Sequence, residues 1–476
     1  MRVLVAALTV VAAALRFATL DRQSFWLDEL VTVSLVRQSF GDMVHAIPHS
    51  EATPYLYYVV AWPWTRLFGS GEVGIRSLSA LAGTATVIAA YGAGSSLLSR
   101  RVGLLAATLV AVNPFLVWYS QEARAYALVT LFVAIGLWFA GKALKGERGA
   151  LAGWALVSSL ALATHYFAVF VIVPEAIWLL ARAPGRRRAA WAVAIPAVVF
   201  LAHLPLLLDQ RGNGRSAAQS PIVKRIVGVP KDLVVGFSFP WELAGTIVAA
   251  LLVLTGLVLL ATQVPARERS RAMVTGAVAT FAVVVPIVLA GGGADSVIAR
   301  NAIVAVIPGA VCLGAGYAAN RAGVVTATVL CTLSLSIVLA VSFDVQYGRT
   351  DWRGLADAIG PATSQRALVV TPDIDAALWR IYLPRLRELP DRPVRVREII
   401  VAGLATQGGF SAGALKPPPA TPYPPPPGFM LVDARLTPTF ALIRYRAVGA
   451  QPRVVTVKVG GLALIPGASA LLLQQP

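Results

Sequence analysis

The sequence predicts a polytopic α-helical membrane protein that ends in a small α/β module. Three observations support this. Of 476 residues, 57% are hydrophobic and only 13% are charged, with a mean hydropathy of +0.71, which is unlike a soluble globular protein. Apolar runs of bilayer length recur from Val3 to Val341, and the composition then becomes that of a soluble domain. We therefore expect a transmembrane domain at residues 1–341 and a C-terminal domain at residues 342–476.

Eleven apolar runs are candidate spans. They cover residues 3–20, 72–98, 102–118, 127–144, 150–166, 167–181, 189–207, 241–262, 272–290, 302–319 and 324–341. The fifth and sixth runs are separated only by the polar corner His165-Tyr166, so that boundary is the least defined. The first run has the small-residue patch of a signal peptide, but its removal would leave the other spans without the first half of their topology.

Basic residues collect in alternate loops, where they act as topology signals. They are Arg2, Arg100, Arg101, Lys142, Lys145, Arg148, Arg182, Arg186, Arg187, Arg188, Arg267, Arg269, Arg271 and Arg321. By the positive-inside rule this side is cytoplasmic. We therefore expect the protein in the cytoplasmic membrane of the cell, with its N-terminus in the cytoplasm and its C-terminal module on the outer side. The net charge of +18 therefore reflects topology and does not indicate a nucleic-acid partner.

The first outer loop, residues 21–71, carries the adjacent carboxylates Asp28 and Glu29. They stand where the first apolar run ends. Mixed apolar and polar residues follow from Leu30 to Ile47, a pattern that suits helices lying on the membrane surface. The aromatic run at 55–62 is typical of headgroup depth.

The later outer loops are also polar. The second loop is short and contains Gln121, Glu122 and Arg124, which we expect to face a cavity or the outer surface, because charges in hydrocarbon are costly. The fifth loop ends at Arg300. The fourth loop, about 208–240, carries cations that we expect to contact lipid headgroups: Lys224, Arg225 and Lys231.

In the C-terminal domain a helix is expected at residues 352–359. Strands are expected at residues 367–370, 396–401, 429–432, 441–445 and 454–459. The proline-rich stretch 416–428 is interpreted as a polyproline-like loop. The sequence contains no glycine-rich phosphate loop, zinc-ligand spacing or serine nucleophile elbow, which disfavours an ATP-driven transporter.

Together these features indicate chemistry on a lipid-linked anionic substrate. A surface carboxylate such as Asp28 can remove a proton from an incoming hydroxyl or help to bind a divalent cation, and Arg124 and Arg300 can hold a phosphate. The alternative for Asp28 and Glu29 is a helix cap near the membrane surface. For Arg300 it is anchoring at the interface.

Several motifs resemble bacterial GT-C glycosyltransferases, in the family 39 group related to protein O-mannosyltransferases and lipid A aminoarabinose transferase. The resemblance is carried by Trp26-Leu27-Asp28-Glu29, Glu51-x-x-Pro54-x-x-Tyr57-Tyr58, Leu67-Phe68-Gly69 with Arg76, Asn113-Pro114, Tyr119 to Tyr126, His165-Tyr166-Phe167 and Asp351-Trp352-Arg353. It covers the first 180 residues well and the remaining spans loosely. One departure is Thr53-Pro54-Tyr55, where relatives often show two successive prolines.

This resemblance implies a GT-C fold and inverting transfer of a sugar from a polyprenyl-phosphate carrier to a lipid, polysaccharide or protein acceptor on the outer face. Asp28 would be the base or acceptor-orienting group with Glu29 as its partner, and Arg124 and Tyr126 would face the donor phosphate. Metal dependence varies in the superfamily, so a Mg²⁺ or Mn²⁺ ion at Asp28 stays open.

Glu51, Glu122, His165 and Tyr166 are further candidate substrate contacts. The alternative for Glu51 is that it orients the first loop, and the alternative for His165 is that it is the hydrogen-bonding residue at the outer end of a helix. Three polar residues in or near apolar runs mark either an internal cavity or paired structural groups: Arg16, Glu175 and His203. Arg76 is expected to support a loop.

Two other functions remain open. An O-antigen ligase or polymerase would also use lipid-linked sugars, but we would expect its critical basic residues in a large late outer loop. A transporter or lipid flippase would place paired ionisable residues in mid-membrane, whereas here the polar residues gather at the outer ends. The glycines from Gly291 are the one feature that favours a transporter.

Overall fold

The computed structural model describes residues 2–213, 221–293, 295–373, 376–405, 424–465 and 468–476. The chain forms two compact units. The helical unit comprises Met1–Leu20 and Leu35–Ala340, and the module unit comprises Asp21–Ser34 and Val341–Pro476. A short piece of the predicted first loop therefore packs with the C-terminal part of the chain.

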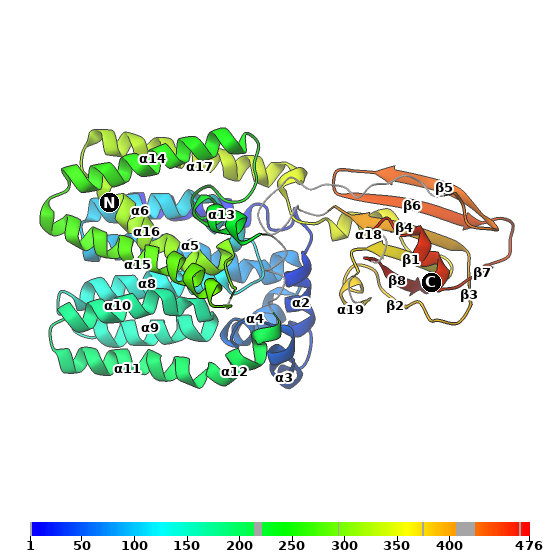
Figure 1. Cartoon of the computed structure of the whole chain (residues 1–476), viewed down its shortest axis with the longest axis horizontal. Helices are drawn as coiled ribbons and strands as arrows, with labels where there is room; N and C mark the ends of the chain where they lie inside the picture. Colours follow the sequence, from blue (N-terminus) through cyan, green and yellow to red (C-terminus); the bar gives the residue numbers. More distant parts are fainter. Residues whose placement is uncertain (1, 214–220, 294, 374–375, 406–423, 466–467) are drawn as a thin grey trace. The chain divides into compact units, whose positions relative to one another are not determined.

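Helices dominate the first of these units (Figure 1). They are α1 (Arg2–Phe17), α3 (Phe40–Ser50), α4 (Leu56–Phe68), α5 (Glu72–Leu97), α6 (Arg100–Val112), α7 (Pro114–Ser120), α8 (Tyr126–Ala143), α9 (Ala150–Thr164), η1 (Tyr166–Ala168), α10 (Val169–Arg182), α11 (Arg186–Ala202), α12 (Leu204–Asp209), η2 (Gln210–Gly212), α13 (Ile222–Val235), α14 (Glu242–Gln263), α15 (Ala266–Gly291), η4 (Ala299–Ala305), α16 (Val306–Tyr317) and α17 (Arg321–Phe343). Helix α2 (Leu27–Val36) begins in the module unit, and the unit boundary falls inside it.

The predicted polytopic helical architecture is confirmed, but the count of eleven spans is not. Each predicted run contains a helix, yet within the described residues only six helices are long and apolar enough to cross a membrane, or eight if each of two bent pairs is one span. Helices α1, α9 and α10 have 16, 15 and 14 residues, which is shorter than the roughly 20 residues that cross a bilayer upright.

Helix α5 lies at the core of the helical unit. Its most apolar window is 67% buried, compared with 22% for α14, whose side chains mostly face outward. Glycines allow its neighbours to approach closely: a Cβ on Gly92 would lie 2.3 Å from the Trp138 ring of α8, and one on Gly94 would lie 2.7 Å from the Gly103 Cα of α6. This small-residue packing is typical of membrane helices.

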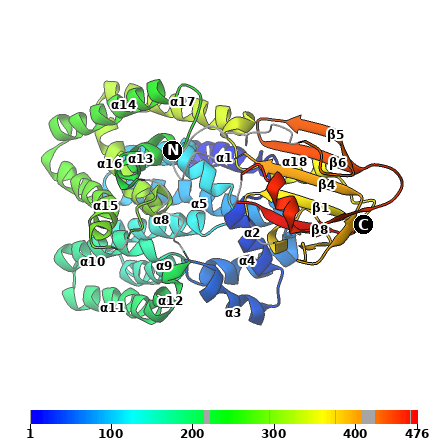
Figure 2. The ribbon, with the colours of Figure 1, turned by 45° about the vertical axis from the view of Figure 1, so that its right-hand side comes forward.

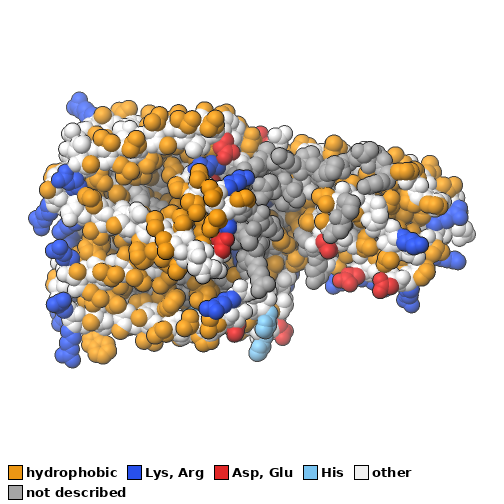
Figure 3. Space-filling view, viewed as in Figure 1, with side chains coloured by type: hydrophobic (Ala, Val, Ile, Leu, Met, Phe, Trp, Pro, Cys, Tyr) orange, Lys and Arg blue, Asp and Glu red, His pale blue; other side chains and the backbone are white. Residues whose placement is uncertain are grey.

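Lys and Arg side chains gather at one end of the helical unit, the left end in Figure 3. Arg100, Lys145, Arg186 and Arg267 are exposed and lie at or next to the ends of α6, α8, α11 and α15. Along the chain, these basic helix ends alternate with the helix ends that carry the predicted site residues. The distribution agrees with the charge pattern read from the sequence, and the orientation it implies stays a prediction.

The polar residues within apolar helices are paired with nearby groups. Arg16 donates to the Ala111 and Val110 carbonyls at 2.9 and 3.1 Å, and Trp154 donates to a Glu175 carboxylate oxygen at 2.8 Å. His203 Nδ1 lies 2.8 Å from the Val199 carbonyl oxygen. Arg76 donates to the Leu20 carbonyl at 2.8 Å, in line with its expected supporting role.

The C-terminal part of the module unit is an α/β fold, shown from another side in Figure 2. Its six-stranded sheet has the order β2-β8-β1-β4-β6-β5, in which only β1 and β4 pair in parallel. The strands and helices are α18 (Trp352–Ile359), β1 (Arg366–Thr371), α19 (Ala376–Trp379), β2 (Leu386–Glu388), β3 (Val394–Val396), β4 (Glu398–Leu404), β5 (Phe429–Leu436), β6 (Phe440–Ala447), β7 (Arg453–Val455), η6 (Val457–Leu462) and β8 (Ala470–Gln474). Strands β3 and β7 form a separate pair.

The predicted helix at 352–359 is confirmed, as are the strands at 367–370, 429–432 and 441–445. The run 396–401 is shared by β3 and β4. The strand predicted at 454–459 is wrong beyond Val455, because the chain turns into η6, which contains Gly460-Gly461. Most of the proline-rich stretch 416–428 lies outside the described residues.

Candidate active site

A buried ion pair joins the first and second predicted loops of the helical unit. Arg124 Nη1 lies 2.7 Å from Glu51 Oε1, with the two side chains 8% and 2% exposed. The Arg124 main-chain N–H donates to the Glu122 carbonyl at 2.8 Å. Burial raises the pKa of nearby Tyr58 well above its usual value, so its hydroxyl stays protonated beside this pair. These polar residues are buried in the protein, as the cost of exposing charge to hydrocarbon requires.

The short second loop is fixed from two sides. Helix α6 meets α7 at a 60° bend, where Asn113 Oδ1 accepts from Leu116 N at 2.9 Å and caps α7. The Asn113 amide donates to the Leu233 carbonyl of α13 at 3.0 Å. At the other end of α7, Gln121 Nε2 donates to Thr19 Oγ1 at 2.7 Å. The turn that carries Arg124 is therefore held in one place.

His165 brings a second arginine into the cluster. It lies between α9 and η1, outside both helices, and is 3% exposed. Burial and the positive charges of Arg124 and Arg300 lower its pKa to about 3, so the imidazole is neutral at physiological pH. The ring of Tyr126 lies 5.5 Å from the ring of His165. Glu122 is fully buried, and its charge and that of Arg300 act on Tyr119.

Tyr166 is connected to the same loop through a residue that the sequence reading missed. Its hydroxyl donates to Gln210 Oε1 at 2.8 Å, and Gln210 Nε2 donates to the Thr53 carbonyl at 3.1 Å. Gln210 is 3% exposed. It directly follows the six-residue helix α12 and lies far from both partners in sequence. Its only sequence signal is an amide two residues after an apolar run.

Arg225 was expected to contact headgroups, and the structure corrects this. Its guanidinium is 5% exposed and binds both Asp295 carboxylate oxygens, at 2.7 and 2.5 Å. It also donates to the Val297 carbonyl at 3.0 Å, and the hydrogen bonds from Arg225 lower the pKa of Asp295. Arg225 therefore ties α13 to the segment that leads to the half-buried Arg300. Lys231 is also paired, 2.7 Å from Glu242.

The adjacent carboxylates of the first loop belong to the module unit and differ in burial. Asp28 and Glu29 both lie in the first turn of α2. Glu29 is fully buried, and its Oε2 accepts the Trp26 main-chain N–H at 3.3 Å, which is a helix-capping contact. Asp28 is only partly buried. The pair therefore divides into a capping residue and a carboxylate that retains solvent access.

Within the part of the chain that the structure describes, no three His, Cys, Asp or Glu side chains are grouped so as to hold a metal ion. Asp28 thus stays a single candidate ligand.

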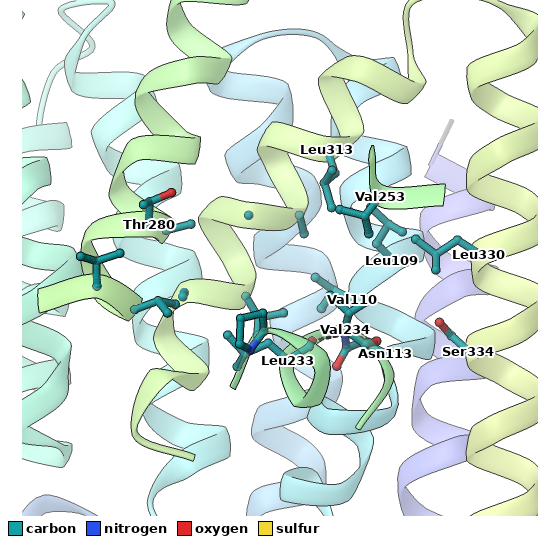
Figure 4. A pocket seen from close by; sticks show the side chains of 18 residues that line it. Leu109, Val110, Asn113, Leu233, Val234, Val253, Thr280, Leu313, Leu330 and Ser334 are labelled. Carbon is teal, nitrogen blue, oxygen red and sulfur yellow. Dashed lines mark hydrogen bonds between the residues drawn. The ribbon is translucent and has the colours of Figure 1, made fainter. Parts of the chain in front are cut away.

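An apolar groove of about 380 Å³ opens between α6, α13, α14, α15, α16 and α17 (Figure 4). Leu109, Val253 and Leu313 line one part of it, and Asn113 and Ser334 add two polar groups. Ala305, which also lines it, is the last residue of η4, the element that carries Arg300. An apolar ligand in this groove would therefore contact the same element as the arginine cluster.

The predicted resemblance to GT-C glycosyltransferases of the protein O-mannosyltransferase type is confirmed over part of the chain. Residues 52–208, about a third of the sequence, match the family model described as dolichyl-phosphate-mannose-protein mannosyltransferase. This segment includes Arg124, Tyr126, His165 and Tyr166. No curated protein matches the sequence.

Solved structures that are similar to the chain include ArnT, an oligosaccharyltransferase and the Pmt1–Pmt2 complex. ArnT from Cupriavidus metallidurans in the apo state shares 18% identity over 66% of this chain and 59% of its own, with a TM-score of 0.47. The apo oligosaccharyltransferase of Archaeoglobus fulgidus shares 12% identity over 76% of this chain and 58% of its own, with a TM-score of 0.49. The Pmt1–Pmt2 complex of S. cerevisiae shares 18% identity over 43% of this chain and 34% of its own, with a TM-score of 0.35. This chain spans about six tenths of the length of the first two.

Proposed function

We propose that the protein is a membrane glycosyltransferase that moves a sugar from a polyprenyl-phosphate donor to an acceptor hydroxyl, with inversion at the anomeric carbon. The observation that carries the proposal is that the charges of Arg124 and Arg300 both act on the buried His165, with Arg300 on the element that also lines the apolar groove. A cationic cluster that shares an element with an apolar groove suits a lipid phosphate. The family match at 52–208 supports a donor of this class.

On the donor side, the polyprenyl chain would occupy the groove between α13 and α17. Its phosphodiester would meet Arg124 and Arg300, whose charges neutralise the phosphate and so improve it as a leaving group. Glu51 holds Arg124 at 2.7 Å. Because a phosphate oxygen can accept the same hydrogen bond as a carboxylate oxygen, donor binding would exchange one partner for the other.

On the acceptor side, Asp28 would take the proton of the acceptor hydroxyl as general base. The acceptor oxygen then forms a bond to the anomeric carbon while the bond from that carbon to the phosphate oxygen breaks. The electron pair leaves with polyprenyl phosphate. Glu29, which caps α2, would hold the first turn of that helix in place. The acceptor is a lipid, polysaccharide or protein.

The proposed location is the cytoplasmic membrane, with the N-terminus in the cytoplasm and the C-terminal module outside. The basic helix ends of Figure 3 support this orientation.

The function is tested by incubating the purified protein in nanodiscs with a panel of synthetic polyprenyl-phosphate sugars, each labelled in the sugar, with and without a chelator. We expect one donor to be hydrolysed or transferred. A chelator effect would assign a divalent cation to the reaction. If no donor in the panel is bound or turned over, the proposal is wrong and a transporter becomes the better explanation.

The groove is tested separately with Gly309→Leu. A Cβ on Gly309 lies 3.8 Å from Ala279, an ordinary contact, so the added side chain extends into the groove without a clash at Cβ. We expect weaker binding of long-chain donors and unchanged binding of a short-chain analogue. The matched control is Ala250→Leu on the exposed face of α14. Equal effects of both variants on the long-chain donor would contradict this use of the groove.

A further inference from the structure

The module unit holds the short segment that leads to Asp28. Ser24, which is 2% exposed, is bonded twice to the chain that enters α18. Its hydroxyl donates to the Thr350 carbonyl at 2.9 Å and accepts from the Trp352 main-chain N–H at 2.9 Å. The next residue, Phe25, donates its main-chain N–H to the Tyr382 hydroxyl at 2.7 Å. The rings of Phe25 and Tyr382 lie 6.3 Å apart.

The three preceding residues are held as well. The Arg353 guanidinium donates to the Asp21 carbonyl at 2.6 Å. The guanidinium carbon of Arg22 lies 4.6 Å from the centre of the Phe343 ring. Gln23 Oε1 accepts the Arg349 main-chain N–H at 2.9 Å. Every residue from Asp21 to Phe25 therefore contacts the C-terminal part of the chain.

The motif Asp351-Trp352-Arg353-Gly354 explains why these contacts converge on α18. Asp351 Oδ1 accepts from Gly354 N at 2.9 Å and caps the helix, and Asp351 Oδ2 accepts from Thr439 Oγ1 at 3.1 Å. A Cβ on Gly354 would lie 2.1 Å from Asp351 Oδ2, so a side chain there is incompatible with the cap. The capped turn presents the Trp352 N–H to Ser24 and the Arg353 side chain to Asp21.

The held segment ends directly before the candidate base. Helix α2 begins at Leu27, and its first turn contains Asp28 and Glu29. The Trp26 N–H is bonded to Glu29, so the start of α2 continues the held segment without a flexible joint. Displacement of a catalytic group by about 1 Å can cost on the order of 100-fold in rate. A device that fixes this turn would therefore have a measurable effect on catalysis.

We propose that the C-terminal module positions the catalytic carboxylate, with Ser24 and Tyr382 as positioning residues that act on Asp28 through the main chain of residues 24–27. This inference rests on the proposed function for the role of Asp28. It gives the module a task beyond binding an acceptor or shielding the site.

The test uses Tyr382→Phe and Ser24→Ala in the full chain. Tyr382→Phe removes the hydroxyl and keeps the ring beside Phe25. The matched control is Ser469→Ala, which removes a hydroxyl bonded to Thr371 inside the module and away from residues 21–25. We expect the two segment variants to lower kcat by about 10- to 100-fold with unchanged KM for the donor, and the control to keep wild-type kcat.

A second readout detects positioning without turnover. A spin label on Leu27→Cys, a side chain that is 40% exposed, reports the mobility of the first turn of α2. The background carries Cys312→Ala and Cys331→Ala, which removes the two native cysteines of the sequence. We expect the label to become more mobile in Tyr382→Phe and Ser24→Ala and to be unchanged in Ser469→Ala.

Wild-type kcat and wild-type label mobility in both segment variants would overturn the inference, as would an equal loss of kcat in the control. If the wild-type protein transfers no sugar, the proposed function fails, and the label alone decides on positioning. Higher label mobility in the segment variants but not in the control would then support positioning by the module. Unchanged mobility in the segment variants would overturn it.

Discussion

Two arginines of the helical unit, Arg16 and Arg124, are both buried but have different partners. Arg16 is fully buried and donates to Ser120 Oγ at 3.1 Å and to the carbonyls of Ala111 and Val110 at the end of α6. Arg124, 7% exposed, is paired with the carboxylate of Glu51. One guanidinium is bonded mainly to the main chain and the other to an acidic side chain.

This difference in partners indicates that Arg16 has a structural role, whereas Arg124 can exchange its partner for a ligand. Helix α6 ends in the bend before Pro114, so its last carbonyls depend on Arg16 for a donor. No ligand can replace these partners without unwinding the helix. A carboxylate partner can rotate away, and a phosphate can take its place with the same charge-assisted hydrogen bonds. Buried arginines in a membrane protein are therefore better interpreted by the partner than by burial alone.

The largest effect on stability is expected for Arg16→Met. The substitution leaves at least two buried carbonyl oxygens without their donor, at about 1–3 kcal/mol each, so we expect a loss of about 3 kcal/mol. Thermal unfolding in detergent measures it. The exposed Arg100→Met serves as the control and should change stability by less than about 0.5 kcal/mol. Equal unfolding temperatures for Arg16→Met and wild type would mean that Arg16 does not stabilise the end of α6.

The next effect concerns affinity. Arg124→Gln removes a charged donor and should weaken binding of polyprenyl phosphate by roughly 10- to 100-fold, in line with about 1.5–3 kcal/mol for a charged hydrogen bond. Glu51→Gln should tighten binding, because it removes the competing negative charge. Binding is measured by titration in nanodiscs, with the exposed Arg101→Gln as control. If Glu51→Gln weakens binding as much as Arg124→Gln does, the pair is structural like Arg16.

The smallest effect is a pH dependence from His165. Its folded pKa of about 3 lies below the unfolded value of 6.5, so below pH 6.5 the unfolded state binds a proton that the folded state does not. This contribution to stability is complete above pH 6.5 and falls by about 1.4 kcal/mol per pH unit as pH drops toward 3.

The contribution of His165 is measured by comparing the free energy of unfolding at pH 7.5 and pH 5.5. Wild type should lose about 1.4 kcal/mol more than His165→Gln over this interval. His45→Gln, an exposed position in α3, is the matched control and should behave as wild type. A wild-type stability change equal to that of His165→Gln would mean that His165 is not held neutral.

The helical architecture could be predicted from the sequence because apolar runs of bilayer length are typical of membrane-spanning helices. It predicted α18 well, since Trp352, Leu355, Ala356 and Ile359 lie on one helix face and all are buried. It missed strand β8, whose short apolar run pairs with β1 about a hundred residues earlier. Periodicity reveals that a run is apolar but not which partner covers it.

The candidate site shows the same limit. The motifs that carry Arg124, His165 and Arg300 were found, but not Gln210 or the pair of Arg225 and Asp295 that tie these loops together. Asp28 and Glu29 are adjacent on a helix, so their side chains point about 100° apart and one of them turns inward. Which one is buried depends on the packing of α2, and this packing involves residues more than three hundred positions away.

The most direct test of the account is the kcat of Asp28→Asn with the donor found in the panel, beside Asp28→Glu and wild type. We predict a loss of at least about 100-fold for Asp28→Asn, with donor affinity and expression unchanged, and partial recovery in Asp28→Glu. Full transfer activity in Asp28→Asn at normal expression would contradict the assignment of Asp28 as the base.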